Sequence, residues 1–219
     1  DVMINPAKLV TKRLIRKIEH PATFIVLDFV SESLQVCCIK IHYTYKTIEK
    51  SIEELEALLG EIPHKLICII RNDQVVEITN DINIKAHDEI YFCCEKVMIN
   101  NICSIILGKE IIFKRIIIGG AGNIGTRLAN QLEDNYKVKL IDHSKKNVLR
   151  ASENLDHTIV LHGDISDSEL LNSESIDETD LFCSVTNDDE NNIMSAIIAK
   201  RFGAKQTMAL VNKQTYAHY

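Results

Sequence analysis

One short segment constrains the fold of this chain more than any other: Gly-Ala-Gly-Asn-Ile-Gly at positions 120–125. It follows the apolar, β-branched run Ile116–Ile118 and opens a stretch in which Ile124, Leu128 and Leu132 recur at helical spacing. A strand that turns through closely spaced glycines directly into a helix is the beginning of a β-α-β unit. The segment therefore predicts a parallel sheet with helices packed on its faces.

The rest of the second half of the chain continues this pattern. Short β-branched runs alternate with helical segments, which is typical of repeated β-α-β units. We expect strands at 115–118, 138–141, 158–161, 180–185 and 206–211. We expect helices at 123–133, 145–154, 166–171 and 188–202. Residues 109–219 are therefore predicted to form an α/β domain with a Rossmann-like, doubly wound parallel sheet.

The first half, residues 1–108, has a different pattern and predicts a small α+β module. Asn5-Pro6 resembles a helix start, and His20-Pro21 ends that helix. A capping box, Ser51 with Glu54, opens a short helix that runs to Leu59. We expect one hairpin from 23–30 and 34–41 around 31–33, a second from 65–71 and 74–78, a strand at 89–94 and a helix at 97–107. No catalytic constellation is recognisable in this half.

The glycine segment supplies the first candidate site residues, Gly120, Ala121, Gly122, Asn123, Ile124 and Gly125. Gly120 permits a tight turn, and Gly122 lets the backbone approach a pyrophosphate whose charge the helix N-terminus stabilises. Gly125 allows the helix to pack closely on the strand. A glycine-rich turn without a ligand is the simpler alternative. The order of strand, turn and helix favours a dinucleotide site over it.

Asp142 ends the second strand of the predicted sheet, 22 positions after Gly120. A carboxylate at this place can accept both ribose hydroxyls of an adenosine, and it repels a 2′-phosphate. It therefore favours NAD(H) over NADP(H). The alternative is a helix N-cap, but Ser144 already supplies that cap. Lys145 and Lys146 lie nearby and leave some tolerance for other phosphates.

Asp164 follows the third strand of the predicted sheet, within His162-Gly163-Asp164. The carboxyl ends of such strands line the crevice in which open α/β sheets bind ligands. Asp164 is therefore a candidate contact on the adenine side. An equally good interpretation is a turn residue that leads into a capping box formed by Ser166 and Glu169.

Thr186 and Asn187 follow the fourth strand and come to the same edge of the sheet as Gly120. Both are candidate ligand contacts. The alternative is structural, because Asn187 with Glu190 also forms a capping-box pattern and acidic residues suit a first helical turn. The acidic residues that follow disfavour a second phosphate site at this place.

Composition and charge exclude several classes of function. The net charge is −6 and no Lys/Arg cluster occurs, so nucleic acid is not an expected partner. No apolar run is long enough to span a bilayer, and no signal peptide is recognisable. The seven cysteines include no CxxC pair, so we expect buried free thiols in a reducing cytosol and no metal site. Because the chain does not begin with Met, we expect it to start inside a longer protein.

Taken together, these residues resemble the TrkA family of regulatory subunits of bacterial potassium uptake systems, which contain RCK domains. The matching segments extend far beyond the glycine motif. They are 118–125, 138–142, 162–167, 185–196 and 199–204, with 185–196 the strongest. Residues 1 to about 97 resemble the RCK C-terminal (TrkA-C) module, whose usual ending strand matches 88–92. The resemblance thus implies a fragment: a TrkA-C module at 1–108 and a TrkA-N nucleotide-binding domain at 109–219.

The resemblance also implies a function. It implies a cytoplasmic regulatory subunit, not an enzyme, that binds NAD+ or NADH and gates a membrane potassium-translocating subunit similar to TrkH. It further implies a homo-oligomer held at the inner face of the cell membrane through its partner. The nucleotide contacts that transfer by motif are Gly120–Gly125, Asp142, Asp164, Thr186 and Asn187.

Two departures from the family pattern and several alternatives accompany this interpretation. The family often has Glu at the position of Asp142, so the aspartate has a shorter reach to the same hydroxyls. The family often has an arginine contact near the end of the fifth strand, where this sequence has Asn212 and Lys213. The same role with ATP or ADP as ligand is one alternative, as in the related Ktr regulators. An NAD-dependent oxidoreductase is another, although no motif places a proton-relaying His, Lys or Tyr. A structural interaction module with a vestigial site is the third.

Overall fold

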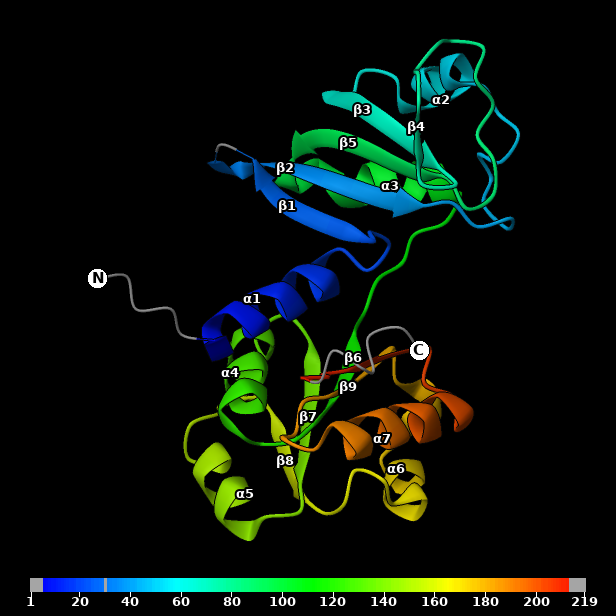
Figure 1. Ribbon diagram of the computed structural model, residues 1–219. Helices are drawn as coiled ribbons and strands as arrows, with labels where there is room; N and C mark the ends of the chain where they lie inside the picture. The colour runs from blue at the N-terminus through cyan, green and yellow to red at the C-terminus, as the bar shows by residue number, and fades with distance from the viewer. Residues whose placement is uncertain (1–5, 30, 213–219) are drawn as a thin grey trace. The chain divides into compact units, whose positions relative to one another are not determined.

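The computed structural model describes residues 6–29 and 31–212, and it divides into two compact units (Figure 1). The described residues up to Ile15 group with those from Phe113 onward, and Arg16–Ile112 form the other unit. The first helix, α1 (Pro6–Glu19), is shared between these groups. Its predicted cap, Asn5, lies outside the described residues. The predicted domain limits, 1–108 and 109–219, remain predictions. The two compact units group residues that contact one another, and such contacts do not show which segments fold independently.

The unit formed by residues 16–112 contains a five-stranded antiparallel sheet in the order β1-β2-β5-β3-β4. Its strands are β1 (Ile25–Phe29), β2 (Ser31–Lys40), β3 (His64–Arg71), β4 (Gln74–Val76) and β5 (Glu89–Glu95). The first expected hairpin is confirmed, since β1 and β2 pair antiparallel, but its turn is not at 31–33, because β2 already begins at Ser31 and pairs with Phe29. The second expected hairpin is confirmed, with Asn72 and Asp73 both at positive φ, as a two-residue β-turn requires.

Helices cover the apolar face of this sheet. They are α2 (Ile52–Leu59), a short 3₁₀ turn η1 (Lys96–Met98) and α3 (Ile99–Leu107). The predicted capping box is present, with Glu54 N donating to Ser51 Oγ at 3.2 Å and Ser51 N donating to Glu54 Oε2 at 2.8 Å. The core includes Ile39, Phe92 and Ile102, all fully buried. The unit is thus an α+β module, as the sequence predicts.

The second unit contains a five-stranded parallel sheet in the order β10-β9-β6-β7-β8. The strands are β6 (Arg115–Gly119), β7 (Lys137–Asp142), β8 (Ile159–His162), β9 (Leu181–Ser184) and β10 (Gln206–Ala209). The first strand of this unit therefore lies between the second and the fourth. This is the doubly wound order, and its switch point lies between β6 and β9. The predicted Rossmann-like sheet is confirmed.

The helices of this unit lie on both sides of the sheet (Figure 1). They are α4 (Asn123–Leu132), α5 (Lys145–Ser152), α6 (Ser168–Ser173), the 3₁₀ turn η2 (Ile176–Glu178) and α7 (Asp189–Arg201). The helices α4 and α5 cover one face, and α6 and α7 cover the other. Fully buried Ile118, Leu140 and Phe182 fill the sheet. Every strand but the edges is thereby buried on both faces, as parallel sheets require.

Two of the predicted helix caps are wrong by one residue. The N-cap of α6 is Asp167, whose carboxylate accepts from Glu169 N and Leu170 N, in place of Ser166. The N-cap of α7 is Asp188, which accepts from Asn191 N, in place of Asn187. An aspartate carboxylate caps the N–H groups of the first turn as well as serine or asparagine does. Sequence spacing therefore could not distinguish Asp167 and Asp188 from the residues that precede them. The side chain of Asn187 is thereby released from a capping role.

Candidate nucleotide site

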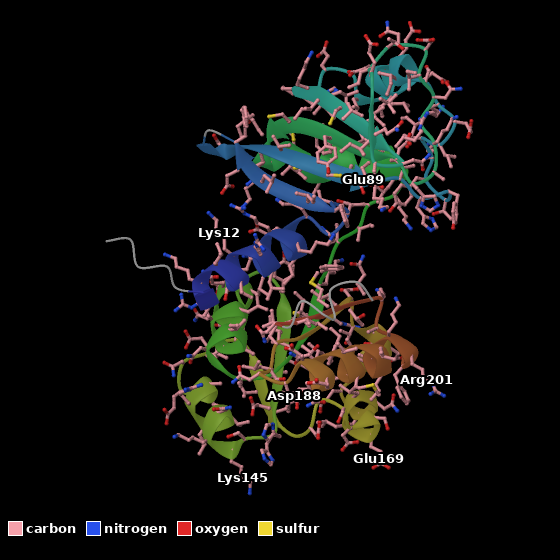
Figure 2. The ribbon with its side chains drawn as sticks, viewed as in Figure 1. Lys12, Glu89, Lys145, Glu169, Asp188 and Arg201 are labelled. Carbon is pink, nitrogen blue, oxygen red and sulfur yellow. The ribbon has the colours of Figure 1, made fainter. Side chains whose placement is uncertain are left out.

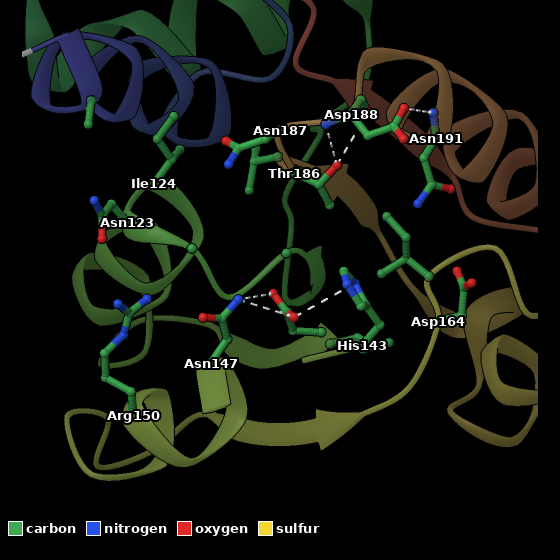
Figure 3. Close-up of a pocket in the computed structure, with 17 residues that line it drawn as sticks. Asn123, Ile124, His143, Asn147, Arg150, Asp164, Thr186, Asn187, Asp188 and Asn191 are labelled. Carbon is green, nitrogen blue, oxygen red and sulfur yellow. Dashed lines mark hydrogen bonds and ion pairs between the residues drawn. The ribbon is translucent and has the colours of Figure 1, made fainter. Parts of the chain in front are cut away.

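A cleft of about 820 Å³ opens at the carboxyl ends of the parallel strands (Figure 3). It lies at the switch point, between the residues that follow β6 and those that follow β9. Its volume is within the range of about 300–1,000 Å³ that is usual for small-molecule sites. Of the predicted site residues, the cleft is lined by Gly120, Gly122, Asn123, Ile124, Asp142, Asp164, Thr186 and Asn187. Ala121 and Gly125 are buried behind its wall.

The turn after β6 is built by Gly120, whose φ is +106°. A Cβ at this position would lie 3.0 Å from Thr186 Cγ2 and 3.1 Å from Thr186 N. A residue with a side chain is therefore excluded both by backbone conformation and by the neighbouring loop. The absence of a Cβ on Gly120 thus allows the loops after β6 and β9 to lie in direct contact.

The third glycine of the motif allows α4 to begin against the turn. A Cβ on Gly125 would lie 1.8 Å from the carbonyl oxygen of Gly120, which no real structure tolerates. The middle glycine is different, because a Cβ on Gly122 would meet nothing within 4 Å and would project into open space beside the cleft. Gly122 is also the N-cap of α4, and no side chain caps that terminus. The N–H groups of the first turn are thus left for an acceptor that approaches Gly122.

Asp142 ends β7 within the cleft wall and is only 5% exposed. Its Oδ2 accepts from Ala121 N at 2.6 Å, and its Oδ1 accepts from Ser144 N at 2.8 Å. These two backbone donors fix the carboxylate between the glycine loop and the start of α5. Ser144 accepts from Asn147 N at 3.5 Å, so the predicted cap of α5 is confirmed.

Asp164 lies in the loop after β8 and lines the opposite end of the cleft from α4 (Figure 3). Its Oδ1 accepts from Ser166 N at 2.8 Å and from Ser166 Oγ at 2.7 Å. These hydrogen bonds from Ser166, helped by nearby His143, lower the pKa of Asp164 below its usual value. One oxygen of Asp164 thus stabilises the turn after β8, and the side chain also lines the cleft. Its contact with a ligand stays a prediction.

Thr186 and Asn187 form the loop after β9. The hydroxyl of Thr186 donates to Asn192 Oδ1 at 2.7 Å, and Thr186 N donates to the same oxygen at 3.0 Å. Asn192 is fully buried, and its Nδ2 donates to the carbonyls of Thr186 and Leu210. All the donors and acceptors of that amide are used, which pins the loop to the sheet. Asn187 is exposed and extends toward the cleft (Figure 3).

Sequence reasoning missed about half of the cleft lining. The residues it did not single out are Ala7, Ile141, His143, Asn147, Arg150, Ile165, Val185, Asp188 and Asn191. Arg150 is the most notable, because its guanidinium donates to the carbonyl of Ala121 at 3.3 Å and brings a fixed positive charge beside the glycine loop. Asn147 and Arg150 are three residues apart on α5 and so share one face of the helix. That spacing was the available signal.

Two further findings bear on what the chain can do. Among the residues that the structure describes, no helix is both long enough and apolar enough to cross a bilayer. Within the same residues, no group of three or more His, Cys, Asp or Glu side chains is arranged to hold a metal ion. Figure 2 shows the side chains along the chain, with Lys145 labelled at the start of α5 and Asp188 at the start of α7.

Comparisons with known proteins show that the second half of the chain is similar to a domain family. Residues 116–219 match the model of the TrkA-N domain. The Trk system potassium uptake protein TrkA of Halomonas elongata is 37% identical over 216 residues, which are 99% of this chain and 47% of that protein. The protein of the same name from Vibrio alginolyticus is 36% identical, again over 99% of this chain and 47% of that protein. The chain thus spans about half the length of these curated relatives.

Solved structures show the same fold at lower identity. The crystal structure of the GsuK RCK domain has a TM-score of 0.56 and 20% identity, covering 93% of this chain and 43% of that one. A structure described as the GsuK channel bound to NAD has a TM-score of 0.53 and 17% identity, covering 92% of this chain and 40% of that one. At these identities the likeness establishes the fold alone.

Proposed function

We propose that this chain, whose residues 116–219 match the model of the TrkA-N domain, is part of a cytosolic regulatory subunit of a potassium uptake system. In this proposal NAD+ or NADH binds in the cleft of the parallel sheet, and the bound nucleotide gates a membrane potassium-translocating subunit similar to TrkH. The names of the relatives, Trk system potassium uptake protein TrkA, support the potassium system. The NAD-bound state of a protein of the same fold is consistent with the ligand.

One observation carries the ligand assignment. The glycine loop leaves open space at Gly122, beside an uncapped helix N-terminus, while Asp142 lies in the same cleft one strand away. The open approach and the free N–H groups suit a phosphate. The carboxylate suits the ribose next to it. Together they match adenosine joined to a pyrophosphate.

The remaining site residues follow from this placement. Asn123 and Ile124 begin α4 and contact the pyrophosphate through their backbone, and Arg150 adds a positive charge on the same side. Asp164 lies on the adenine side, and Thr186 and Asn187 meet the nicotinamide half of the ligand.

The charge of the far end of the cleft favours a dinucleotide over ATP or ADP. Asp188 and Asn191 line the cleft beyond Thr186, and Asp188 caps α7 with its carboxylate. Additional phosphates directed toward this carboxylate are repelled, whereas a nicotinamide carries no negative charge. ATP or ADP remains the alternative ligand, because Asp142 recognises a ribose that all these nucleotides share.

An oxidoreductase is less consistent with this cleft. Hydride transfer needs a proton-relaying group beside the nicotinamide. The histidine of the lining, His143, directly follows Asp142 and is 82% exposed, on the adenosine side of the proposed ligand. We therefore assign no catalytic residue.

The wider assembly is also part of the proposal. Residues 1–108 act as the TrkA-C module of the preceding repeat, and residues 109–219 act as the TrkA-N domain of the next. The subunit forms a homo-oligomer and lies at the inner face of the cell membrane through its potassium-translocating partner. The differential affinity of the nucleotide for two arrangements of this oligomer would then supply the gating free energy.

Potassium uptake in cells tests the regulatory role. Gly122→Val, introduced into the full-length protein, adds a side chain only to the open space of the cleft. Asn130→Val adds the same side chain to the exposed surface of α4 and serves as the control. We expect rubidium uptake to lose its regulation in the Gly122 variant and to keep it in the control. Normal regulation by a Gly122 variant that no longer binds NADH would favour a structural module with a vestigial site.

A further inference from the structure

The carboxylate of Asp142 can accept a limited number of further hydrogen bonds beyond those from the backbone. Each carboxylate oxygen accepts up to about two hydrogen bonds. Oδ2 already accepts from Ala121 N and Oδ1 from Ser144 N, at 2.6 and 2.8 Å. Because both donors are backbone groups of the loops that shape the cleft, they are fixed. One acceptor position on each oxygen therefore remains for other donors.

A single side chain uses both of these positions. Asn147 Nδ2 lies 3.3 Å from Oδ1 and 3.2 Å from Oδ2 of Asp142 (Figure 3). It is thus nearly equidistant from the two oxygens and bridges them. Asn147 is half-buried and lines the cleft, so the bridge forms at the surface that a ligand would meet.

A ribose makes the same demand on the carboxylate. Its 2′- and 3′-hydroxyls are neighbouring donors, and they bind one carboxylate through its two oxygens. The amide of Asn147 and the diol of a ribose therefore require the same two acceptor positions. They cannot hold the carboxylate together while the two backbone donors stay in place.

We propose that the amide of Asn147 is an internal competitor for Asp142, which a ribose diol must displace in order to bind. This inference rests on the proposed nucleotide function of the cleft. The relative strengths of the two interactions allow the exchange. The distances from Asn147 are at the long end of the range for N–H···O bonds, whereas hydroxyl–carboxylate bonds are short and strong. Asn147 thus lowers affinity for every nucleotide that binds through both hydroxyls.

Removing the polar side chain of Asn147 from the cleft is therefore expected to strengthen nucleotide binding, although loss of a polar group from a site usually weakens it. Asn147→Ala leaves Ala121 N and Ser144 N on Asp142 and frees the remaining positions for the ribose. We expect NADH to bind about 3- to 10-fold more tightly, which corresponds to the net value of one ordinary hydrogen bond. Asn147→Ser has a shorter side chain without the amide group. We expect this variant to bind NADH more tightly as well.

Calorimetric titration with NADH tests this, using the chain, its two Asn147 variants and a matched control. The control is Asn130→Ala, which removes another asparagine amide from a carboxylate, that of Glu133, at 3.4 Å and outside the cleft. Its affinity is expected to stay unchanged. The same titrations with ADP and 2′-deoxy-ADP add a second readout, because a ligand with one hydroxyl fewer gains less from the vacated position.

The possible outcomes distinguish a failure of the Asn147 competition from a failure of the proposed nucleotide binding. Weaker NADH binding by both Asn147 variants would make Asn147 a ligand contact and overturn the proposal. Unchanged affinity, or an equal gain for ADP and 2′-deoxy-ADP, would also overturn it. If the unmodified chain binds none of these nucleotides, the nucleotide function itself fails.

Discussion

Replacing Gly125 with alanine places a methyl group against the backbone of the glycine loop. The added Cβ would lie 1.8 Å from Gly120 O and 3.0 Å from Gly120 C. The contact with the oxygen must open to at least 3.0 Å, and because its partner is backbone, either α4 or the turn after β6 has to move. Strain of this kind costs about 3 kcal/mol. The helical preference of alanine returns about 1 kcal/mol.

The net destabilisation is therefore about 2 kcal/mol, which corresponds to a fall in Tm of roughly 4–8 °C. The same chemical change at Gly122 serves as the comparison, because its Cβ would meet nothing within 4 Å. Alanine at this N-cap costs about 1 kcal/mol or less. Its methyl group instead keeps a phosphate away from the first turn of α4, so we expect NADH affinity to fall at least about tenfold.

Thermal melting followed by circular dichroism, together with calorimetric titration of NADH, distinguishes the two variants. Gly125→Ala is expected to lose stability and affinity together. Gly122→Ala is expected to lose affinity with little change in Tm. A Gly125 variant as stable as the parent would refute the close packing of α4 on the turn. Undiminished NADH affinity in the Gly122 variant would refute the proposed approach of the pyrophosphate.

Two further outcomes are expected. Burial disfavours the charge of Glu133, but hydrogen bonds from His157 N and Thr158 outweigh it and lower its pKa below 4.5, so its contribution to stability is present above that pH and disappears as the pH falls further. Glu133→Gln should therefore reduce Tm at neutral pH, with the difference from the parent narrowing in acid; a constant difference would contradict this. Asn192→Ala removes the three hydrogen bonds that join its side chain to Thr186, and should cost about 2–4 kcal/mol in unfolding free energy and weaken NADH binding. Melting curves and titration check it, and an unaffected NADH affinity would argue against a role for this loop in the site.

The parts of the fold that follow from local sequence were predictable. Strands of the parallel sheet are buried on both faces, so runs such as Ile116–Ile118 stand out from their surroundings. The glycine positions were equally predictable, because positive φ at Gly120 and close packing at Gly125 make any side chain there costly. These are constraints that a single residue expresses by its own chemistry.

The details that depend on competition between neighbours were not predictable. Several adjacent side chains could cap α6 and α7, and only the geometry selects Asp167 and Asp188. The same holds for Asn147 and Arg150, since their positions in the cleft depend on which face of α5 packs against the glycine loop. Sequence spacing shows that they share a face but does not show what that face meets.

Titration of the purified chain with NADH tests the central claim, a nucleotide site at the switch point of the parallel sheet, most directly. We expect one saturable site that Gly122→Val abolishes with little change in Tm, since the added side chain enters only open space. Asn130→Val should bind as the parent does. Absence of binding by NADH, ATP and ADP to the unmodified chain, or binding that survives Gly122→Val, would contradict the account.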